Sequence, residues 1–313
     1  MVRVQRVLWV LAILLMVAQI KSAIYAVDVD QESIPVFVSI LPQKYFVERI
    51  GGQAVQVSVM VGPGQSPATY EPLPRQMSEL TRAVLYFSIG VPFEDAWLKK
   101  FTAAAPNMKV INTRAGITLR KMDRYFSNQA PASKEQQVKS NDRAHHHHHH
   151  DRGLDPHIWL DPILVKKQAK TIYQALVELR PEKEAYFSGN LRKFLTDLDA
   201  VHLEIEEAFS EMTNKKLLVF HPAWGYFCDR YGLTQVPIEI EGKEPGPREL
   251  GELIEFAKKE GIKVIFVQEQ FSSKQAETVA KAVNGKVVLI NPLAEDYLNN
   301  LKSIAQVIRE ELM

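Results

Sequence analysis

Short apolar runs alternate with helix-length segments along most of the chain, and this alternation occurs twice. In the first stretch the runs are Val36–Leu41, Val55–Val61, Val84–Ile89 and Lys109–Ile111. In the second stretch they are Leu217–Phe220, Val236–Ile240, Val264–Val267 and Val287–Ile290. Continuous runs rich in β-branched residues are typical of parallel strands that are buried on both faces. The pattern therefore predicts an α/β protein with two lobes, each with about four parallel strands flanked by helices.

A long amphipathic pattern separates the two stretches. Its apolar residues recur every three or four positions, and they are Phe187, Leu191, Phe194, Leu198, Val201, Ile205, Ala208 and Met212. This spacing predicts one helix over Glu182–Met212, about 46 Å long at 1.5 Å per residue. An ordinary core helix is the alternative, but the position favours a rigid helix that joins the lobes. We therefore expect a first lobe over 34–180, a linking helix over 181–213 and a second lobe over 214–313.

Residues 126–155 have a different composition, with Ser, Gln, Lys, Asn and His and almost no large apolar side chain. Such a segment buries too little apolar surface to offset its ordering entropy, so we expect a disordered loop inside the first lobe. It contains six consecutive histidines: His145, His146, His147, His148, His149 and His150. Flexible imidazoles bind Zn²⁺, Ni²⁺ or Cu²⁺ at weak, exchanging sites, which predicts an accessory metal-binding loop. An engineered tag is the alternative, although tags usually lie at chain ends.

The first 26 residues have the features of a cleavable secretory signal. Arg3 and Arg6 precede the apolar run Val7–Ala18, and Ile24-Tyr25-Ala26 offers a cleavage site. An apolar run of this length is too short to span about 30 Å of hydrocarbon as a helix. An uncleaved anchor is the alternative. Because no cysteine lies near the cleavage point, we expect a periplasmic protein without a lipid anchor or stable membrane insertion.

The net charge and the cysteine content exclude several classes of protein. The 38 basic and 37 acidic residues leave a net charge of +1, which does not attract nucleic acid by bulk charge. The single cysteine, Cys228, excludes an intrachain disulfide framework and a cysteine-rich zinc finger. We expect Cys228 to be a buried, unreactive thiol, and the chain to be a monomer.

Polar residues follow several predicted strands. His221 follows Leu217–Phe220, and His157 begins a helix after the His-rich segment. Ligands of open α/β sheets bind beyond the carboxyl ends of the strands. Two neutral imidazoles facing one cleft would suit a first-row transition metal, whereas a lone histidine more often caps or packs locally.

Four segments carry a resemblance to a known family. They are Pro67-Ala68-Thr69-Tyr70-Glu71-Pro72, Asp155-Pro156-His157-Ile158-Trp159-Leu160-Asp161, Phe220-His221-Pro222-Ala223-Trp224-Gly225-Tyr226 and Pro292-Leu293-Ala294-Glu295-Asp296-Tyr297. From about Ile34 to its end, the chain resembles zinc/manganese solute-binding proteins of ABC importers. The resemblance implies two α/β lobes joined by a long helix, and delivery of a metal ion to a membrane permease without covalent chemistry. The His-rich insertion is typical of the zinc branch, so the implied ion is Zn²⁺, with Mn²⁺ or another divalent transition metal as the alternative.

The resemblance also implies a ligand set, which this chain matches at two of four positions. The second and third ligands of the family correspond to His157 and His221. The first, a histidine, corresponds to Ala68, which cannot bind a metal. The fourth, an aspartate, corresponds to Asn291, whose neutral amide oxygen is a weaker ligand.

Other residues are candidates to complete such a site. Glu269 follows Val264–Val267 at the expected cleft and is the leading candidate for an additional carboxylate ligand. Glu71 and Gln65 lie near Ala68 in sequence and are weaker candidates.

The acidic run Glu239, Glu241 and Glu244 either lines the cleft or contacts the permease, and a solvated loop is the favoured alternative.

Two further functions compete with metal delivery. A metallohydrolase would use the two histidines with Glu269 and a water, but the chain lacks His-Glu-x-x-His and Gly-x-Ser-x-Gly motifs. A metal buffer or an adhesin with a degenerate cleft is the second alternative, because Ala68 and Asn291 depart from the family pattern.

Overall fold

Two parallel sheets form the framework of the protein. A computed structural model describes residues 33–123, 153–239, 243–271 and 274–313. The first sheet has the order β2-β1-β3-β4, with β1 (Ile34–Ile40), β2 (Val55–Val61), β3 (Leu85–Ser88) and β4 (Lys109–Asn112). The second has the order β6-β5-β7-β8, with β5 (Lys216–Val219), β6 (Thr234–Pro237), β7 (Val264–Val267) and β8 (Lys286–Leu289). All strand pairs are parallel, which confirms the predicted fold class.

Helices surround both sheets. Those of the first half are α2 (Leu41–Gly51), α3 (Pro74–Leu80), α4 (Pro92–Ala104) and α5 (Pro162–Leu179). Those of the second half are α7 (Gly225–Tyr231), α8 (Pro247–Lys259), α9 (Lys274–Ala282) and α10 (Tyr297–Leu312). Short 3-10 turns occupy Gly52–Ala54, Ile158–Leu160 and Pro181–Lys183. The predicted secretory signal and the six histidines lie outside the described residues. Within the described ranges, no helix has the length and apolarity needed to cross a membrane.

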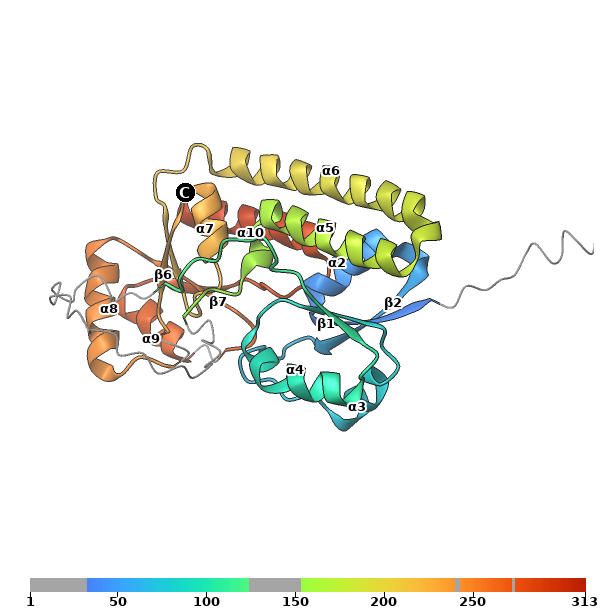
Figure 1. Ribbon diagram of the computed structural model, residues 1–313. Helices are drawn as coiled ribbons and strands as arrows, with labels where there is room; N and C mark the ends of the chain where they lie inside the picture. Colours follow the sequence, from blue (N-terminus) through green and yellow to red (C-terminus); the bar gives the residue numbers. More distant parts are fainter. Residues whose placement is uncertain (1–32, 124–152, 240–242, 272–273) are drawn as a thin grey trace, which may run out of the picture.

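Helix α6 (Glu184–Phe209) extends along both lobes (Figure 1). It packs against α2 and α5 of the first lobe and against α7 and α10 of the second. Its buried face consists of Phe187, Leu191, Phe194, Leu198, Val201, Ile205 and Phe209. The helix begins two residues later than predicted because the chain first makes the 3-10 turn after Pro181. An α-helix with one apolar face across both lobes is a stiff connection, as the sequence pattern predicts.

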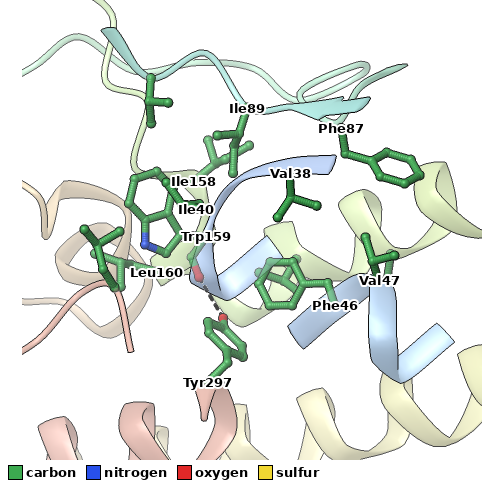
Figure 2. Packing of buried hydrophobic residues seen from close by; sticks show 14 of the residues in the cluster. Val38, Ile40, Phe46, Val47, Phe87, Ile89, Ile158, Trp159, Leu160 and Tyr297 are labelled. Carbon is green, nitrogen blue, oxygen red and sulfur yellow. Dashed lines mark hydrogen bonds between the residues drawn. The ribbon is translucent and has the colours of Figure 1, made fainter. Parts of the chain in front are cut away.

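The two lobes share one large hydrophobic core, and Trp159 lies at their junction. Figure 2 shows Trp159 beside Ile40 of β1, in the same cluster as residues of β3 and α2 and with its backbone carbonyl bonded to Tyr297 of α10. The indole Nε1 donates a hydrogen bond to the carbonyl of Pro292 at 2.8 Å, and Tyr297 Oη donates to the carbonyl of Trp159 at 2.7 Å. A smaller, separate core lies between the second sheet and helices α8 and α9, and it includes Leu253 and Ile265. Cys228 is buried, as predicted.

Candidate metal centre

The strand order places the carboxyl end of β5 at the centre of the site. In the second sheet β6 and β7 flank β5 on opposite sides, so the connections that leave β5 and β7 diverge there. Open α/β sheets form a crevice at such a point. His221 lies two residues beyond the end of β5, and Gln268 directly follows β7.

His157 belongs to a tightly hydrogen-bonded segment before α5. Asp161 caps this helix, because its Oδ1 accepts hydrogen bonds from the amides of Ile163 at 2.8 Å and Leu164 at 3.4 Å. Upstream, Asp155 Oδ1 accepts from the backbone amide of His157 at 3.0 Å and lies 2.7 Å from its Nδ1. Asp155 is completely buried and His157 is 8% exposed. Local backbone geometry and one carboxylate therefore determine where the His157 ring points.

His221 is held from three sides by the second lobe. Its Nδ1 lies 2.6 Å from Glu239 Oε2. The amide group of Gln268 accepts from the backbone N–H of His221 at 3.3 Å and donates to its carbonyl at 2.9 Å. The ring stacks on Phe271 with a centroid distance of 4.8 Å and an interplanar angle of 18°.

The two imidazoles meet through their Nε2 atoms, which lie 3.3 Å apart. A carboxylate beside each Nδ1 favours the tautomer that carries its proton there, and in that tautomer Nε2 is left as the lone-pair atom. Two opposed lone pairs repel each other unless a cation or a proton lies between them. Nitrogens bound at about 2.05 Å to one tetrahedral Zn²⁺ would lie about 3.3–3.4 Å apart. The pair therefore has the spacing of two ligands of one ion.

Burial lowers the pKa of His157, although the neighbouring Asp155 carboxylate acts in the opposite direction. Its ring is therefore neutral at pH 7, which is the form that binds a metal. A carboxylate that accepts from the other ring nitrogen also orients a metal-binding histidine and raises its basicity as a ligand.

The structure gives Asn291 and Glu269 other surroundings. Asn291 Oδ1 accepts a hydrogen bond from the amide of Leu293 at 2.8 Å. Glu269 is exposed in a turn, because the preceding Gln268 takes the inward position after β7. Within the described ranges, no three His, Cys, Asp or Glu side chains converge closely enough to hold a metal ion.

The loop after β2 carries the weaker candidates at its surface. Ala68, Glu71 and Gln65 are all exposed. Gln65 instead closes a turn, with its Oε1 accepting from the amide of Gly62 at 2.9 Å.

Two carboxylates of the site correct expectations from the sequence. Asp155 was expected at the end of a disordered loop, but it is buried between Arg120 and His157, and Leu154 pairs with Lys121 in a β-bridge. Glu239 was expected in a solvated loop, yet it is 6% exposed because it hydrogen-bonds His221.

One sequence signal points to Asp155. An aspartate two residues before a histidine can accept that histidine's backbone amide in an Asx turn. No comparable local signal identifies Glu239, which is 18 residues from His221.

Known proteins match most of the chain. The family model of the periplasmic component A of the zinc-uptake complex, ZnuA, matches residues 36–311. The chain is 26% identical over 275 residues to the high-affinity zinc uptake system protein ZnuA of Bacillus subtilis strain 168, covering 85% of this chain and 80% of that protein.

Two solved structures are similar over most of the chain. A crystal structure of ZnuA has a TM-score of 0.79 and 39% identity, covering 90% of this chain and all of that one. A zinc-bound ZnuA with residues 138–173 deleted in its own numbering has the same score and identity, covering 90% of this chain and 98% of that one.

Proposed function

The chain belongs to the family of periplasmic zinc-uptake components, and from this membership and its paired histidines we propose that it captures Zn²⁺ for delivery to an ABC importer. The family is a transport component and not an enzyme, so the metallohydrolase alternative is set aside. The observation that carries the proposal is the 3.3 Å separation of the Nε2 atoms of His157 and His221, each ring having its Nδ1 beside a carboxylate.

We propose that His157 and His221 are the first two protein ligands. The remaining positions of a tetrahedral ion are then open to water or to side chains that move on binding, with Asn291 and Glu269 as the candidates. Zinc suits such a site because it accepts nitrogen ligands and tolerates an open position. We further propose export to the periplasm through the first 26 residues, action as a monomer, and transfer of the ion to a membrane permease.

A competitive Zn²⁺ titration with metal counting by mass spectrometry tests the site. Each of His145 to His150 is first changed to serine, so that these imidazoles bind no zinc. We expect this chain to bind one Zn²⁺ tightly and a His157→Ala, His221→Ala variant of it to bind more than about 100-fold more weakly, since loss of an outer-shell partner alone typically costs about 10–100-fold.

His202→Ala is the matched control. His202 is also part-buried, but its Nδ1 pairs with Tyr231 Oη at 3.3 Å instead of facing a second histidine. We expect this variant to bind zinc as the parent chain does. Absence of zinc binding by the parent chain, or equal binding by the double variant, would reject the proposed site.

Asn291→Ala and Glu269→Gln extend the titration to the open positions. A side chain that moves onto the ion should weaken zinc binding when it is replaced. A variant that binds as tightly as the parent chain removes that residue from the ligand set.

A further inference from the structure

We propose that Arg120 is a positioning residue for zinc capture, because its guanidinium joins the segments that carry both histidines. The inference rests on the proposed function. Arg120 lies in the segment after β4 and touches no candidate ligand directly, so it would act only through the groups that it holds.

One side of the guanidinium faces the His157 segment. Arg120 Nη1 lies 3.3 Å from Asp155 Oδ2, while Asp155 Oδ1 lies 2.7 Å from His157 Nδ1. Asp155 is completely buried, and Arg120 is 20% exposed. A buried carboxylate needs a cation or several donors to remain charged. Arg120 therefore supports the carboxylate that sets the orientation of His157.

The other side of the guanidinium faces helix α7, which begins four residues after His221. Arg120 Nε lies 2.9 Å from Asp229 Oδ2 on this helix. The backbone N–H of Arg120 donates to Tyr226 Oη at 3.0 Å, and Tyr226 Oη donates to the carbonyl of Asp155 at 2.9 Å. A shift of Arg120 would therefore reach both halves of the histidine pair.

Asp123 completes the arrangement. Its two oxygens accept from Arg120 Nη2 at 2.9 Å and from Nη1 at 3.1 Å, and one of them also accepts from Gln235 Nε2 at 2.8 Å. Three carboxylates thus surround one planar cation, a geometry that suits a guanidinium better than an ammonium.

Gly225 makes this close approach possible. A Cβ atom at Gly225 would lie 1.6 Å from Arg120 Nη1 and 2.7 Å from Asp155 Oδ2. Any larger residue here must displace the guanidinium from the buried aspartate. Gly225→Ala therefore disturbs the contact without changing any charge.

Arg120→Gln removes a positive charge and also removes a contact that holds Asp155, and these two losses should change zinc affinity in opposite directions. Removal of a positive charge near a cation site should strengthen zinc binding by Coulomb's law. Loss of the group that holds Asp155 should weaken it. We expect binding about tenfold weaker, at the lower end of the range for outer-shell partners. Arg120→Lys should recover part of the lost zinc affinity. Gly225→Ala should weaken zinc binding, as Arg120→Gln does.

A double-mutant cycle tests whether Arg120 acts through Asp155. Zinc affinity is measured by chelator competition for Arg120→Gln, Asp155→Asn and the double variant, in the chain whose His145 to His150 are serine. If Arg120 acts through Asp155, the double variant binds as Asp155→Asn does, because coupled residues are non-additive. Additive losses, unchanged affinity in Arg120→Gln, or tighter binding would overturn the inference.

Arg49→Gln is the matched control. Arg49 is also partly buried and paired with a carboxylate, Asp197, but it joins α2 to α6. We expect this variant to lose thermal stability without metal and to keep its zinc affinity. An equal loss of affinity in Arg49→Gln would show a general structural effect and reject the inference.

Two further variants keep the inference testable if Arg120→Gln is unstable. If Arg120→Gln does not fold, Asp229→Asn and Gly225→Ala decide, since each keeps the arginine and its charge and disturbs only its contacts. Weaker zinc binding in both supports the inference, and unchanged binding in both rejects it.

The parent chain separates a failure of the inference from a failure of the proposed function. If the parent chain binds no zinc at all, the proposed function itself fails. If the parent binds and the cycle is additive, only the role of Arg120 fails.

Discussion

His157 and His221 each have a carboxylate at Nδ1, but the two carboxylates have different surroundings. Asp155 is completely buried, is bound by Arg120, and lies two residues from the histidine that it orients. Glu239 reaches His221 from the end of β6, across 18 residues of chain. One histidine is thus positioned by its own segment, and the other by contacts between separate loops.

The hydrophobic cores next to the two histidines also differ. The His157 segment runs into Trp159, which lies in the large core shared by both lobes. His221 stacks on Phe271, which packs against the smaller core under α8 and α9. Regions with fewer buried apolar contacts open at lower free energy. The chain around His221 also reaches the large core through Val219 and Trp224, but its stacking partner Phe271 does not. We therefore expect His157 to be the fixed half of the site and His221 the half that adjusts.

Trp159→Ala should have the largest effect on this comparison. Removal of a buried tryptophan typically costs about 3–5 kcal/mol of unfolding free energy. It also removes the hydrogen bond to Pro292 that joins the lobes. Urea unfolding without metal measures the loss. Trp97→Ala is the control: because Trp97 is only half-buried, it should lose less. Equal losses would contradict the central place of Trp159 in the shared core.

The two carboxylates offer the next largest effect. We expect Asp155→Asn and Glu239→Gln each to weaken zinc binding by about 10–100-fold. Asp155→Asn should lie at the upper end, because Asp155 Oδ1 accepts from both the backbone and the ring of His157. Isothermal titration of the two variants side by side measures this order. A larger loss of zinc affinity in Glu239→Gln would mean that His221, and not His157, is the more firmly positioned histidine.

The pH dependence of stability without metal should reveal the buried histidine. Burial lowers the pKa of His157 below its ordinary value of 6.5, so under acid conditions the unfolded chain binds a proton that the folded chain does not. Stability therefore falls as pH drops below about 6.5, with a slope of at most about 1.4 kcal/mol per pH unit, and levels off below the folded pKa.

A variant isolates this contribution. Burial raises the pKa of Glu94 above its ordinary value of 4.5, so its contribution has the opposite sign over a pH range that extends upward from 4.5. That contribution is present in the parent chain and in the variant alike. Urea unfolding between pH 5 and 8 should show a steeper fall for the parent chain than for His157→Gln. Identical stability profiles for the two chains would mean that the pKa of His157 is the same in the folded and the unfolded state.

Phe271→Leu should have the smallest effect. Loss of the aromatic stack on His221 should weaken zinc binding by about 2–10-fold, since aromatic pairs contribute about 0.5–1.5 kcal/mol beyond their buried area. Zinc titration measures the change. Phe256→Leu on α8 is the control and should bind zinc as the parent chain does. A loss in Phe271→Leu as large as that in Asp155→Asn would mean that stacking outweighs the carboxylates.

The sequence was sufficient for the architecture, and it singled out two histidines that the structure brings together. The apolar runs corresponded to eight parallel strands, and the stripe from Phe187 to Ile205 corresponded to the buried face of α6. His157 and His221 stood out because each lies in a polar segment at an element boundary. Glu239 and Gln268 did not stand out, because a glutamate in an acidic run and a glutamine beside Glu269 look like surface residues.

By itself the sequence determined the two parallel sheets and the helix that joins them, because burial of strands and helices is encoded in local periodicity. Only the tertiary structure decided that two histidines 64 residues apart would face each other at 3.3 Å. It also decided that Asp155, Glu239 and Gln268 would hold them. Such contacts depend on which surfaces converge when the lobes share a core, and no local pattern in the chain records that convergence.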